Sequence, residues 1–389
     1  MKPALRILLA LLCLLTGGQA LAGDAEDREL VQRLLSGSEP QAAWFSESFL
    51  RQVPLAQIDQ IVRDLQRRYG EATRVGGEAG AFVAWTGTHR IPVRLERDPE
   101  GRIVGLLFRP AEPIEVNLYQ TLHALRSLPG EVAYVIQRGR GLLSAHKADE
   151  ALAVGSAFKL AVLQALRTRI ERGGARWDDV VRLEPQHFSL PSGFLQDMPA
   201  GSPLTLHSLA AAMIAQSDNT ATDALIAYLG RGAVEAVAGL APLLTTREAF
   251  QLKADPELYE DYAGRDLRGR RRLLTEIADR PLPRPGRVAG PWRAEAEWRI
   301  SARDLCRLMS AVGDLEITQI NPGPTSKGDW RSVAYKGGSE TGVLNMTTLA
   351  TDAEGQSTCV AVTWNDVTAL DEARFAELYR DLLLALRDR

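Results

Sequence analysis

Apolar residues at the start of the chain change from a helical to an alternating period. Spacings of three and four residues predict three short helices, over 27–35, 44–53 and 54–69. Alternating runs between glycine and Asp-Pro-Glu-Gly turns then predict three strands, over 81–86, 90–96 and 102–108. Helices followed by an antiparallel meander indicate a small α+β accessory domain at 23–113, which the two-proline connector RPAEPIEV closes. We expect this domain to have a structural role.

The remainder, 114–389, has helical patterns at both ends and strands near both ends, with a helical middle. Helices are predicted over 116–128, from Ser156 onward, and over 206–216, 220–229, 233–240, 301–312 and 371–386. Strands are predicted over 131–137, 141–145, 332–336, 342–351 and 357–364. Residues 254–298 are expected to form an irregular basic insert. A polyanion site is the alternative, but interspersed carboxylates and amphipathic spacing favour a solvated surface. The whole pattern predicts an αβα sandwich, an antiparallel sheet flanked by helices, with an all-helical lobe.

The first 22 residues have the features of a secretory signal peptide. Lys2 and Arg6 precede an apolar run over 7–15, and the small residues Ala20 and Ala22 offer a cleavage site before Gly23. The apolar run is too short to span a membrane easily. We therefore expect an exported protein, periplasmic or secreted, with no membrane span after cleavage.

Two cysteines, Cys306 and Cys359, remain after that cleavage. An exported location would permit a disulfide between them. Each lies in an apolar segment without a nearby histidine, however, so two buried, unpaired thiols are the favoured expectation.

Composition excludes some partners and draws attention to lysine. The formal net charge of −3 gives no reason to expect a nucleic-acid partner, and the five histidines are scattered without metal-ligand spacing. We therefore expect no metal and no cofactor. Only six of the 46 basic residues are lysine, the side chain that burial can deprotonate near neutral pH.

One of these lysines lies in the segment Ser156-Ala157-Phe158-Lys159, at the start of an apolar helix. Residues three apart share a helix face, so the hydroxyl and the amine are expected to face the same way. Backbone amides at a helix start favour negative charge on Ser156, and burial would make Lys159 a base for it. The alternative is a helix-capping serine followed by a lysine that reaches the surface.

The triplet Ser217-Asp218-Asn219 lies between two apolar helices and is more specific, because the chain has only five asparagines. Ser217 is a candidate to relay a proton to a leaving group, and the Asn219 amide a candidate to bind a substrate carbonyl. Alternatively, the triplet is a turn whose Ser and Asp cap the next helix.

The third motif, Lys336-Gly337-Gly338-Ser339, ends a predicted strand. Gly338 would let a substrate backbone approach the strand edge, the Ser339 amide would donate to an oxyanion, and Lys336 would supply a cation. By itself this is an ordinary strand-to-turn glycine pair. The order and placement of all three motifs together favour one active site.

With these motifs, residues 114–389 resemble the penicillin-recognising serine hydrolases, which include class A β-lactamases, DD-peptidases and related esterases. The resemblance implies that Ser156 is the acylated nucleophile, Lys159 its base and Ser217 the proton relay. It also implies that Lys336 and Ser339 bind substrate, and that the backbone amides of Ser156 and Ser339 form the oxyanion hole. The small leading domain is similar to that of the β-lactamase-like protein of the clavulanic acid gene cluster.

The sequence departs from the class A pattern at three places. The loop glutamate with an asparagine four residues later, which holds the deacylating water, is missing. Glu248 lies in about the right part of the chain, but a surface position is expected for it. Gly337 replaces the usual threonine, and Asn345 stands about where relatives have an arginine on the next strand. Acylation chemistry is therefore expected to be intact, whereas fast penicillin turnover does not follow.

Three functions are compatible with this sequence. The first is a β-lactamase-like hydrolase that deacylates slowly, and the second an esterase or peptidase of small acyl or cell-wall substrates. The third is a penicillin-binding sensor that stays acylated. In each case the partner is a small acyl molecule. Three aromatic residues near the motifs are expected to be mainly packing residues, with a cleft position as the alternative: Phe194, Trp330 and Tyr335.

Overall fold

The computed structural model describes residues 23–288, 293–325 and 328–387. The expected signal peptide at 1–22 lies outside the described residues. The chain divides into two compact units between Asn117 and Leu118, a few residues beyond the expected boundary at 113. No helix among the described residues combines the length and the apolar character that a membrane crossing requires.

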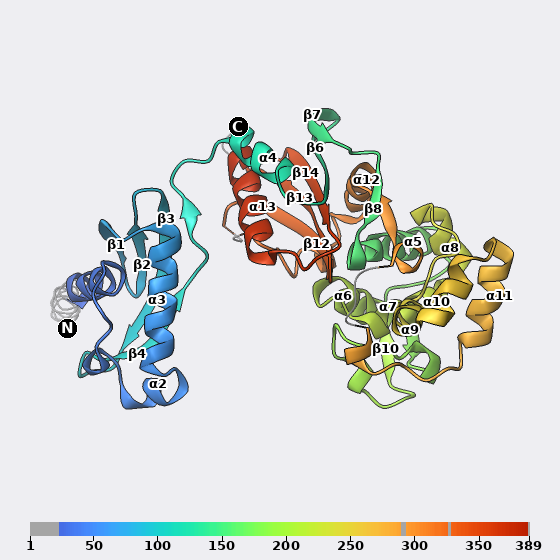
Figure 1. Ribbon diagram of the computed structural model, residues 1–389, viewed down its shortest axis with the longest axis horizontal. Helices are drawn as coiled ribbons and strands as arrows, with labels where there is room; N and C mark the ends of the chain where they lie inside the picture. Colours follow the sequence, from blue (N-terminus) through green and yellow to red (C-terminus); the bar gives the residue numbers. More distant parts are fainter. Residues whose placement is uncertain (1–22, 289–292, 326–327, 388–389) are drawn as a thin grey trace, which may run out of the picture. The chain divides into compact units, whose positions relative to one another are not determined.

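The first unit packs helices on one antiparallel sheet (Figure 1). A helix at 23–35 precedes η1 (Ala42–Trp44), α2 (Glu47–Gln52) and α3 (Leu55–Tyr69). The sheet order is β1 (Arg74–Glu78), β2 (Ala81–Trp85), β3 (His89–Arg97) and β4 (Ile103–Phe108), and β5 (Glu112–Pro113) also pairs with β3. The alternation of β2 and β3 puts Phe82, Ile91 and Val93 in one buried core with Ile58 and Val62 of α3. Strand β1 was not predicted, because its two glycines give it no apolar alternation.

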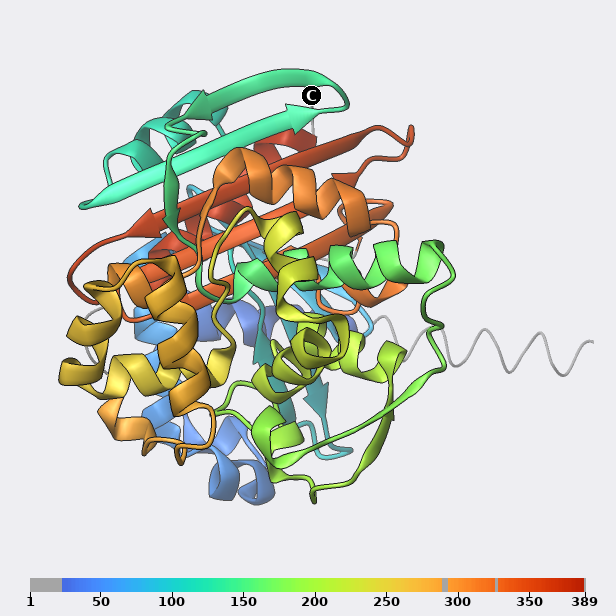
Figure 2. The ribbon, with the colours of Figure 1, turned by 90° about the vertical axis from the view of Figure 1, so that its right-hand side faces the viewer.

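The second unit is built on a five-stranded antiparallel sheet of order β12-β13-β14-β6-β7. The strands are β6 (Glu131–Arg138), β7 (Gly141–His146), β12 (Ser332–Glu340), β13 (Val343–Thr351) and β14 (Ser357–Asn365). Strand β14 pairs with β6, so the first and last strands of this unit lie side by side, as Figure 2 shows. The edge strand β12 continues through Gly337, Gly338 and Ser339, beyond its predicted end at Lys336.

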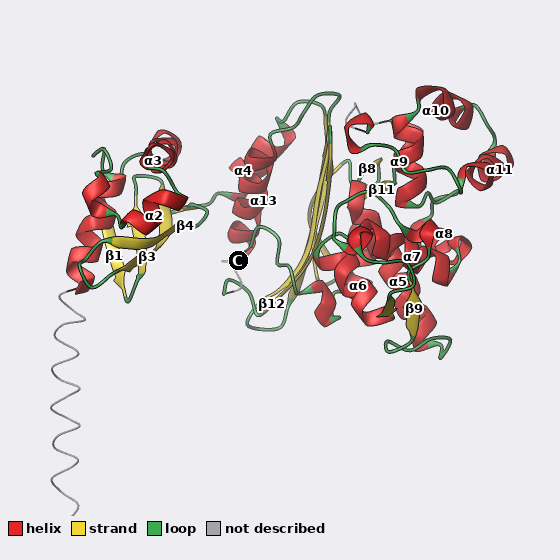
Figure 3. Cartoon of the chain, turned by 90° about the horizontal axis from the view of Figure 1, so that it is seen from below, coloured by secondary structure: helices red, strands yellow, loops and turns green. Residues whose placement is uncertain are grey.

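Helices cover both faces of this sheet, as the sequence predicted (Figure 3). On one face lie α4 (Leu118–Arg126) and α13 (Glu372–Arg387), and on the other α5 (Lys159–Glu171) and α12 (Ala302–Val312). Two short sheets pair β8 (Ala151–Ala153) with β11 (Arg299–Ser301) and β9 (Val180–Arg182) with β10 (Pro203–Thr205). Short 3-10 turns connect these elements: η2 (Gly155–Phe158), η3 (Pro185–His187), η4 (Leu195–Asp197), η5 (Pro285–Arg287), η6 (Ala294–Ala296) and η7 (Glu316–Thr318).

Within the described residues, the helical lobe comprises α6 (Leu206–Ala215), α7 (Asn219–Leu229), α8 (Arg231–Ala238), α9 (Thr246–Ala254), α10 (Pro256–Ala263) and α11 (Leu267–Ile277). The prediction of an irregular insert was therefore wrong for 256–277. Residues 278–288 and 293–298 contain only the 3-10 turns η5 and η6, and 289–292 lie outside the described residues. Asp255 caps α10 by accepting from Leu258 N, and Asp266 caps α11 by accepting from Gly269 N. Leu273, Leu274 and Ile277 of α11 are buried, so most of its arginines lie on the outer face, whereas Arg270 packs over the buried ring of Tyr262.

Cys306 and Cys359 form a disulfide, contrary to the favoured expectation of free thiols. Cys306 lies on α12 and Cys359 on β14, and these two elements pack against each other in the core. Their Cα atoms are 5.8 Å apart, a separation that a disulfide can bridge. Sequence spacing alone does not reveal that a helix crosses a distant strand at these two positions.

Candidate active site

The cleft between the sheet edge and the helical lobe has a volume of about 650 Å³. Six residues of the three motifs line it: Ser156, Ser217, Asn219, Gly337, Gly338 and Ser339. The structure thus brings together segments that are far apart in the sequence, as the motif order predicted.

Ser156 lies in the 3-10 turn η2, and α5 proper begins at Lys159. The helix start was therefore predicted three residues early. The helix is surrounded by protein, because five apolar residues after Lys159 are also fully buried, and its amphipathic pattern is weak. Phe158 stacks on Trp298 with ring centroids 4.0 Å apart, which fixes the turn that carries Ser156.

Lys159 is fully buried, so the alternative of a lysine that reaches the surface is excluded. Its amine donates to Ser217 O at 2.5 Å and to Asn219 Oδ1 at 2.6 Å, and it lies 3.2 Å from Ser217 Oγ. Burial, reinforced by the positive charge of Lys336, holds the pKa of Lys159 well below its usual value, although Asp223 and Asp218 oppose this shift. The amine is thus a base buried one helical turn from Ser156.

Ser217 is the residue on which both lysines converge. Its hydroxyl is 3.2 Å from Lys159 Nζ and 3.1 Å from Lys336 Nζ. The backbone of Ser217 has φ +57, a left-handed conformation that is uncommon for a residue with a side chain. Ser192 Oγ donates to Ser217 O at 2.7 Å and holds this turn from the loop opposite, a contact the sequence did not indicate.

Asp218 and Asn219 organise the turn around Ser217. Asp218 is completely buried and caps α7 by accepting from Ala221 N at 2.8 Å, and it also accepts from Phe194 N and Leu195 N. Capping was the alternative explanation of the triplet, and the structure shows that Asp218 has this role. Asn219 Nδ2 donates to Leu190 O at 3.0 Å, so only its second amide hydrogen remains for a ligand.

Lys336 is buried on β12, and its amine donates to Gly337 O as well as to Ser217 Oγ. Burial lowers its pKa to about 7. Two amines with lowered pKa values that both contact one hydroxyl can exchange a proton through it.

The backbone of β12 lies against the turn that carries Ser156. A side chain at Gly338 would come within 2.6 Å of Ser156 N, and one at Gly155 within 3.3 Å of Ser339 N. Only glycine allows this approach. Ser156 and Ser339 both line the cleft, which is the placement that a two-amide oxyanion hole needs.

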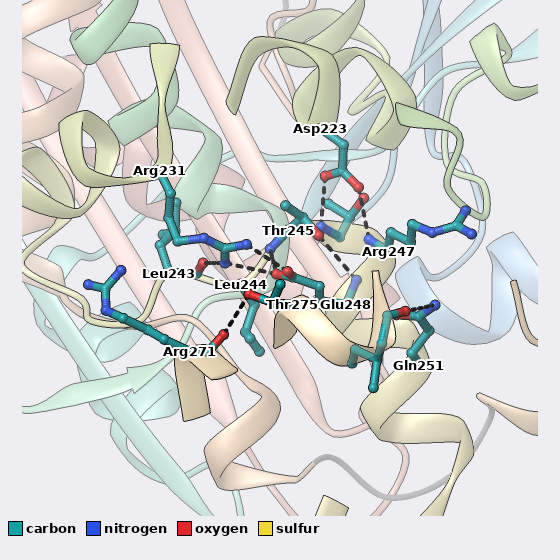
Figure 4. A network of polar contacts seen from close by, with 12 residues as sticks. Asp223, Arg231, Leu243, Leu244, Thr245, Arg247, Glu248, Gln251, Arg271 and Thr275 are labelled. Atoms are coloured by element: carbon teal, nitrogen blue, oxygen red, sulfur yellow. Dashed lines mark hydrogen bonds and ion pairs between the residues drawn. The ribbon is translucent and has the colours of Figure 1, made fainter. Parts of the chain in front are cut away.

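Glu248 is a structural residue rather than the surface residue we expected. It is 6% exposed, and its oxygens accept from Arg231 at 2.6 and 2.9 Å and from Thr245 N at 2.8 Å (Figure 4). The residues of α9 that line the cleft are Thr246, Phe250 and Lys253, at helical spacing on another face. Glu248 is thus absent from the cleft lining and is held in an ion pair.

A buried ionic cluster on the cleft wall was missed at the sequence level. Lys253 Nζ lies 2.7 Å from Glu297 Oε1 and pairs with Glu340. Burial raises the pKa of Glu297 well above its usual value, whereas the charges of Glu297 and Glu340 outweigh burial and raise the pKa of Lys253. The rarity of lysine in this chain was the signal that could have drawn attention to Lys253.

The remaining predicted positions differ in their surroundings. Asn345 is buried, and its amide donates to Val362 O and Thr363 Oγ1 within the sheet. Tyr335 lines the cleft, so its side chain is not merely a packing residue. Trp330 is buried and Phe194 half exposed, and neither is part of the cleft lining among the described residues.

Comparisons with known proteins agree with this fold. None of the curated proteins matches the chain. Among solved structures, a beta-lactamase from Sphaerobacter thermophilus is 22% identical with a TM-score of 0.50, over 69% of this chain and 96% of that one. A mutant class A beta-lactamase of the last common ancestor of Gram-negative bacteria is 16% identical with a TM-score of 0.50, over 70% and 98%. At these identities the likeness carries the fold alone.

A family model locates the relationship in sequence. The model of the beta-lactamase enzyme family matches residues 122–319, just over half of the chain. The match begins after the first unit, so the likeness we expected for that domain stays a prediction. The predicted superfamily and fold class of the second unit are confirmed: this chain belongs to the beta-lactamase enzyme family.

Proposed function

We propose that the protein is an exported serine hydrolase that forms an acyl-enzyme on Ser156. The observation that carries the proposal is the convergence of two buried lysine amines on the Ser217 hydroxyl, at 3.2 and 3.1 Å, beside the turn that holds Ser156. Burying two amines costs free energy, and strongly shifted pKa values of buried groups are typical of functional sites. Such groups are expected where protons are transferred.

In the proposed reaction the neutral amine of Lys159 takes the proton of the Ser156 hydroxyl, and the oxygen attacks the substrate carbonyl. The amides of Ser156 and Ser339 stabilise the resulting oxyanion. Ser217 then passes a proton from the lysine amines to the leaving group, which departs and leaves the acyl group on Ser156. Water completes the turnover by hydrolysing that ester.

The substrate of this reaction is a small acyl compound, and a β-lactam is the first candidate because of the family. The deacylation step is expected to be slow. Glu248, the candidate for the deacylating base, is held in an ion pair with Arg231. The α9 residues that line the cleft include no carboxylate. A sensor that stays acylated is the limiting case of slow deacylation.

Hydrolysis of esters or cell-wall fragments is the second candidate. It is favoured by Gly337 and Asn345, which replace side chains that would bind a β-lactam carboxylate. An ester needs no such anchor.

The test is to mix the mature protein with a penicillin, a cephalosporin and a p-nitrophenyl ester and to follow its intact mass over time. A transient adduct with product supports an enzyme, and a stable adduct supports a sensor. Peptide mapping should place the adduct on Ser156, and Ser156→Ala should form none. If no compound gives an adduct, or Ser156→Ala still gives one, the proposal is wrong. Export is tested separately, by the N-terminus of the protein recovered outside the cytoplasm, which should be Gly23.

A further inference from the structure

A tyrosine on the cleft wall occupies space that the third motif leaves empty. Tyr335, Gly337 and Ser339 are every second residue of β12, so they lie on the same face of the strand. A side chain at Gly337 would collide with the Tyr335 hydroxyl, and one at Gly323 would come within 2.6 Å of the Tyr335 ring. Gly323 has φ +64 and faces the ring from the loop before β12. Two glycines therefore form the slot in which the tyrosine lies.

The Tyr335 hydroxyl is a hydrogen-bond donor without a protein partner. It makes no hydrogen bond with any other residue in the part of the chain that the structure describes, and it borders the cleft. Burial raises the pKa of Tyr335 to about 12, so the phenol keeps its proton at neutral pH and remains uncharged. A donor in this state suits an acceptor oxygen on a ligand.

Tyr335 lies toward the end of the cleft where a leaving group is expected. Its hydroxyl lies next to Gly337, the residue that follows Lys336, and both Gly337 and Ser217 line the cleft. Ser339, whose amide belongs to the proposed oxyanion hole, lies four residues further along β12. Because the Tyr335 hydroxyl lies beside Gly337, two residues from Ser339, the two sites are roughly 7 Å apart along the strand at about 3.3 Å per residue.

No cation among the described residues that line the cleft is free to pair with a carboxylate. The charged residues that line it, within the described ranges, are Lys253, Glu340 and Glu372. The Lys253 side chain is only 6% exposed and is paired with two glutamates, whereas Glu372 is exposed. An incoming carboxylate would thus lose its hydration without gaining an ion pair, which is unfavourable.

We propose that Tyr335 recognises the leaving-group part of the substrate by donating a hydrogen bond to an uncharged oxygen, such as an ester or amide carbonyl. The cleft consequently selects acyl substrates without a carboxylate at that position. The inference rests on the proposed acyl-enzyme chemistry and names the substrate class for it.

Two N-acetylglycyl esters test this inference, one of glycolamide and one of glycolic acid, which differ only in carboxamide against carboxylate. Calorimetric titration into Ser156→Ala measures their binding without turnover. We expect the glycolamide ester to bind at least tenfold more tightly than the glycolate ester. Adding Tyr335→Phe should weaken the binding of the glycolamide ester by roughly 3- to 10-fold, which is the effect of losing one uncharged hydrogen bond. The affinity for the glycolate ester should change less than about twofold.

Two further variants control this measurement. Gly337→Ala, which must displace the tyrosine hydroxyl, should weaken the glycolamide ester in the same way. Tyr228→Phe removes a hydroxyl that lies 3.5 Å from Asp179 outside the cleft, and should leave both affinities unchanged. Thermal melting checks that each variant is folded.

The proposal is overturned if the glycolate ester binds as tightly as the glycolamide ester, if Tyr335→Phe binds like its parent, or if neither ester binds. Turnover by the wild-type protein distinguishes a failure of this recognition proposal from a failure of the proposed catalytic function. Binding that depends on Tyr335, without any adduct on Ser156, would refute the catalysis and keep the recognition. An adduct on Ser156, together with binding that does not change in Tyr335→Phe, would support the catalysis and refute the recognition.

Discussion

Replacing Glu248 distinguishes a structural carboxylate from a deacylating base. In Glu248→Gln the side chain keeps its size but loses the charge that pairs with Arg231, at 2.6 and 2.9 Å. It also weakens the reciprocal cap with Thr245 at the start of α9. The Glu248 side chain is 8% exposed and that of Arg231 is 26% exposed, so the arginine would be left largely buried without its partner.

The expected loss of stability lies between two limits. Breaking a fully buried ion pair costs about 3–5 kcal/mol, whereas an exposed pair contributes about 0.2–1 kcal/mol. Because Arg231 is partly exposed, we expect a loss of about 2–3 kcal/mol in the free energy of unfolding, including the weakened cap. For a unit of this size that corresponds to a decrease in Tm of about 4–12 °C.

Thermal and urea unfolding of Glu248→Gln measure this loss, and the decay of the acyl adduct measures deacylation in the same variant. The double variant with Arg231→Met should be less destabilised than the sum of the single variants. Glu171→Gln is the matched control, because Glu171 is 59% exposed in its pair with Arg167, and its effect should stay within about 0.5 kcal/mol. A Glu248→Gln variant that melts like the wild type, and whose adduct persists at least tenfold longer, would refute the structural role.

Three further predictions concern the lysines and the disulfide. Lys159→Met should slow the acylation of Ser156 by about 10²- to 10⁴-fold, measured by stopped-flow with a p-nitrophenyl ester, and an unchanged rate would exclude Lys159 as the base. Lys336 is charged in the unfolded chain below pH 10.5 but only below about pH 7 when folded, so stability should rise with pH between these values by up to ~1.4 kcal/mol per pH unit. Lys336→Met should abolish that contribution, and a pH slope of unfolding identical to that of the wild type would contradict it. The double variant Cys306→Ser/Cys359→Ser should lose about 4 kcal/mol by urea unfolding, because the disulfide closes a loop with a sequence separation of 53, and a variant as stable as the oxidised protein would contradict this.

The sequence predicted several parts of the protein well because local patterns decide them. The alternation and the apolar runs of β6, β13 and β14 identified the sheet, and the helical spacing at both ends identified α4 and α13. The conjunction of Ser156-x-x-Lys159, Ser217-Asp218-Asn219 and Lys336-Gly337-Gly338 identified the cleft, since each motif lies at a boundary between elements. The prediction failed at α10 and α11, where aspartate caps begin two helices inside a segment rich in charged residues.

By itself, then, the sequence determined the fold class and the chemical types at the candidate site, because hydrophobic period and residue identity are local properties. Tertiary structure alone decided how those residues are used. Burial and the contact of both amines with Ser217 set the pKa values of Lys159 and Lys336. The packing of α12 on β14 brings Cys306 and Cys359 close enough for a disulfide. Arg231 forms an ion pair with Glu248. The physical reason is that desolvation and pairing depend on which distant segments come within a few ångströms, and that distance is not contained in any one stretch of sequence.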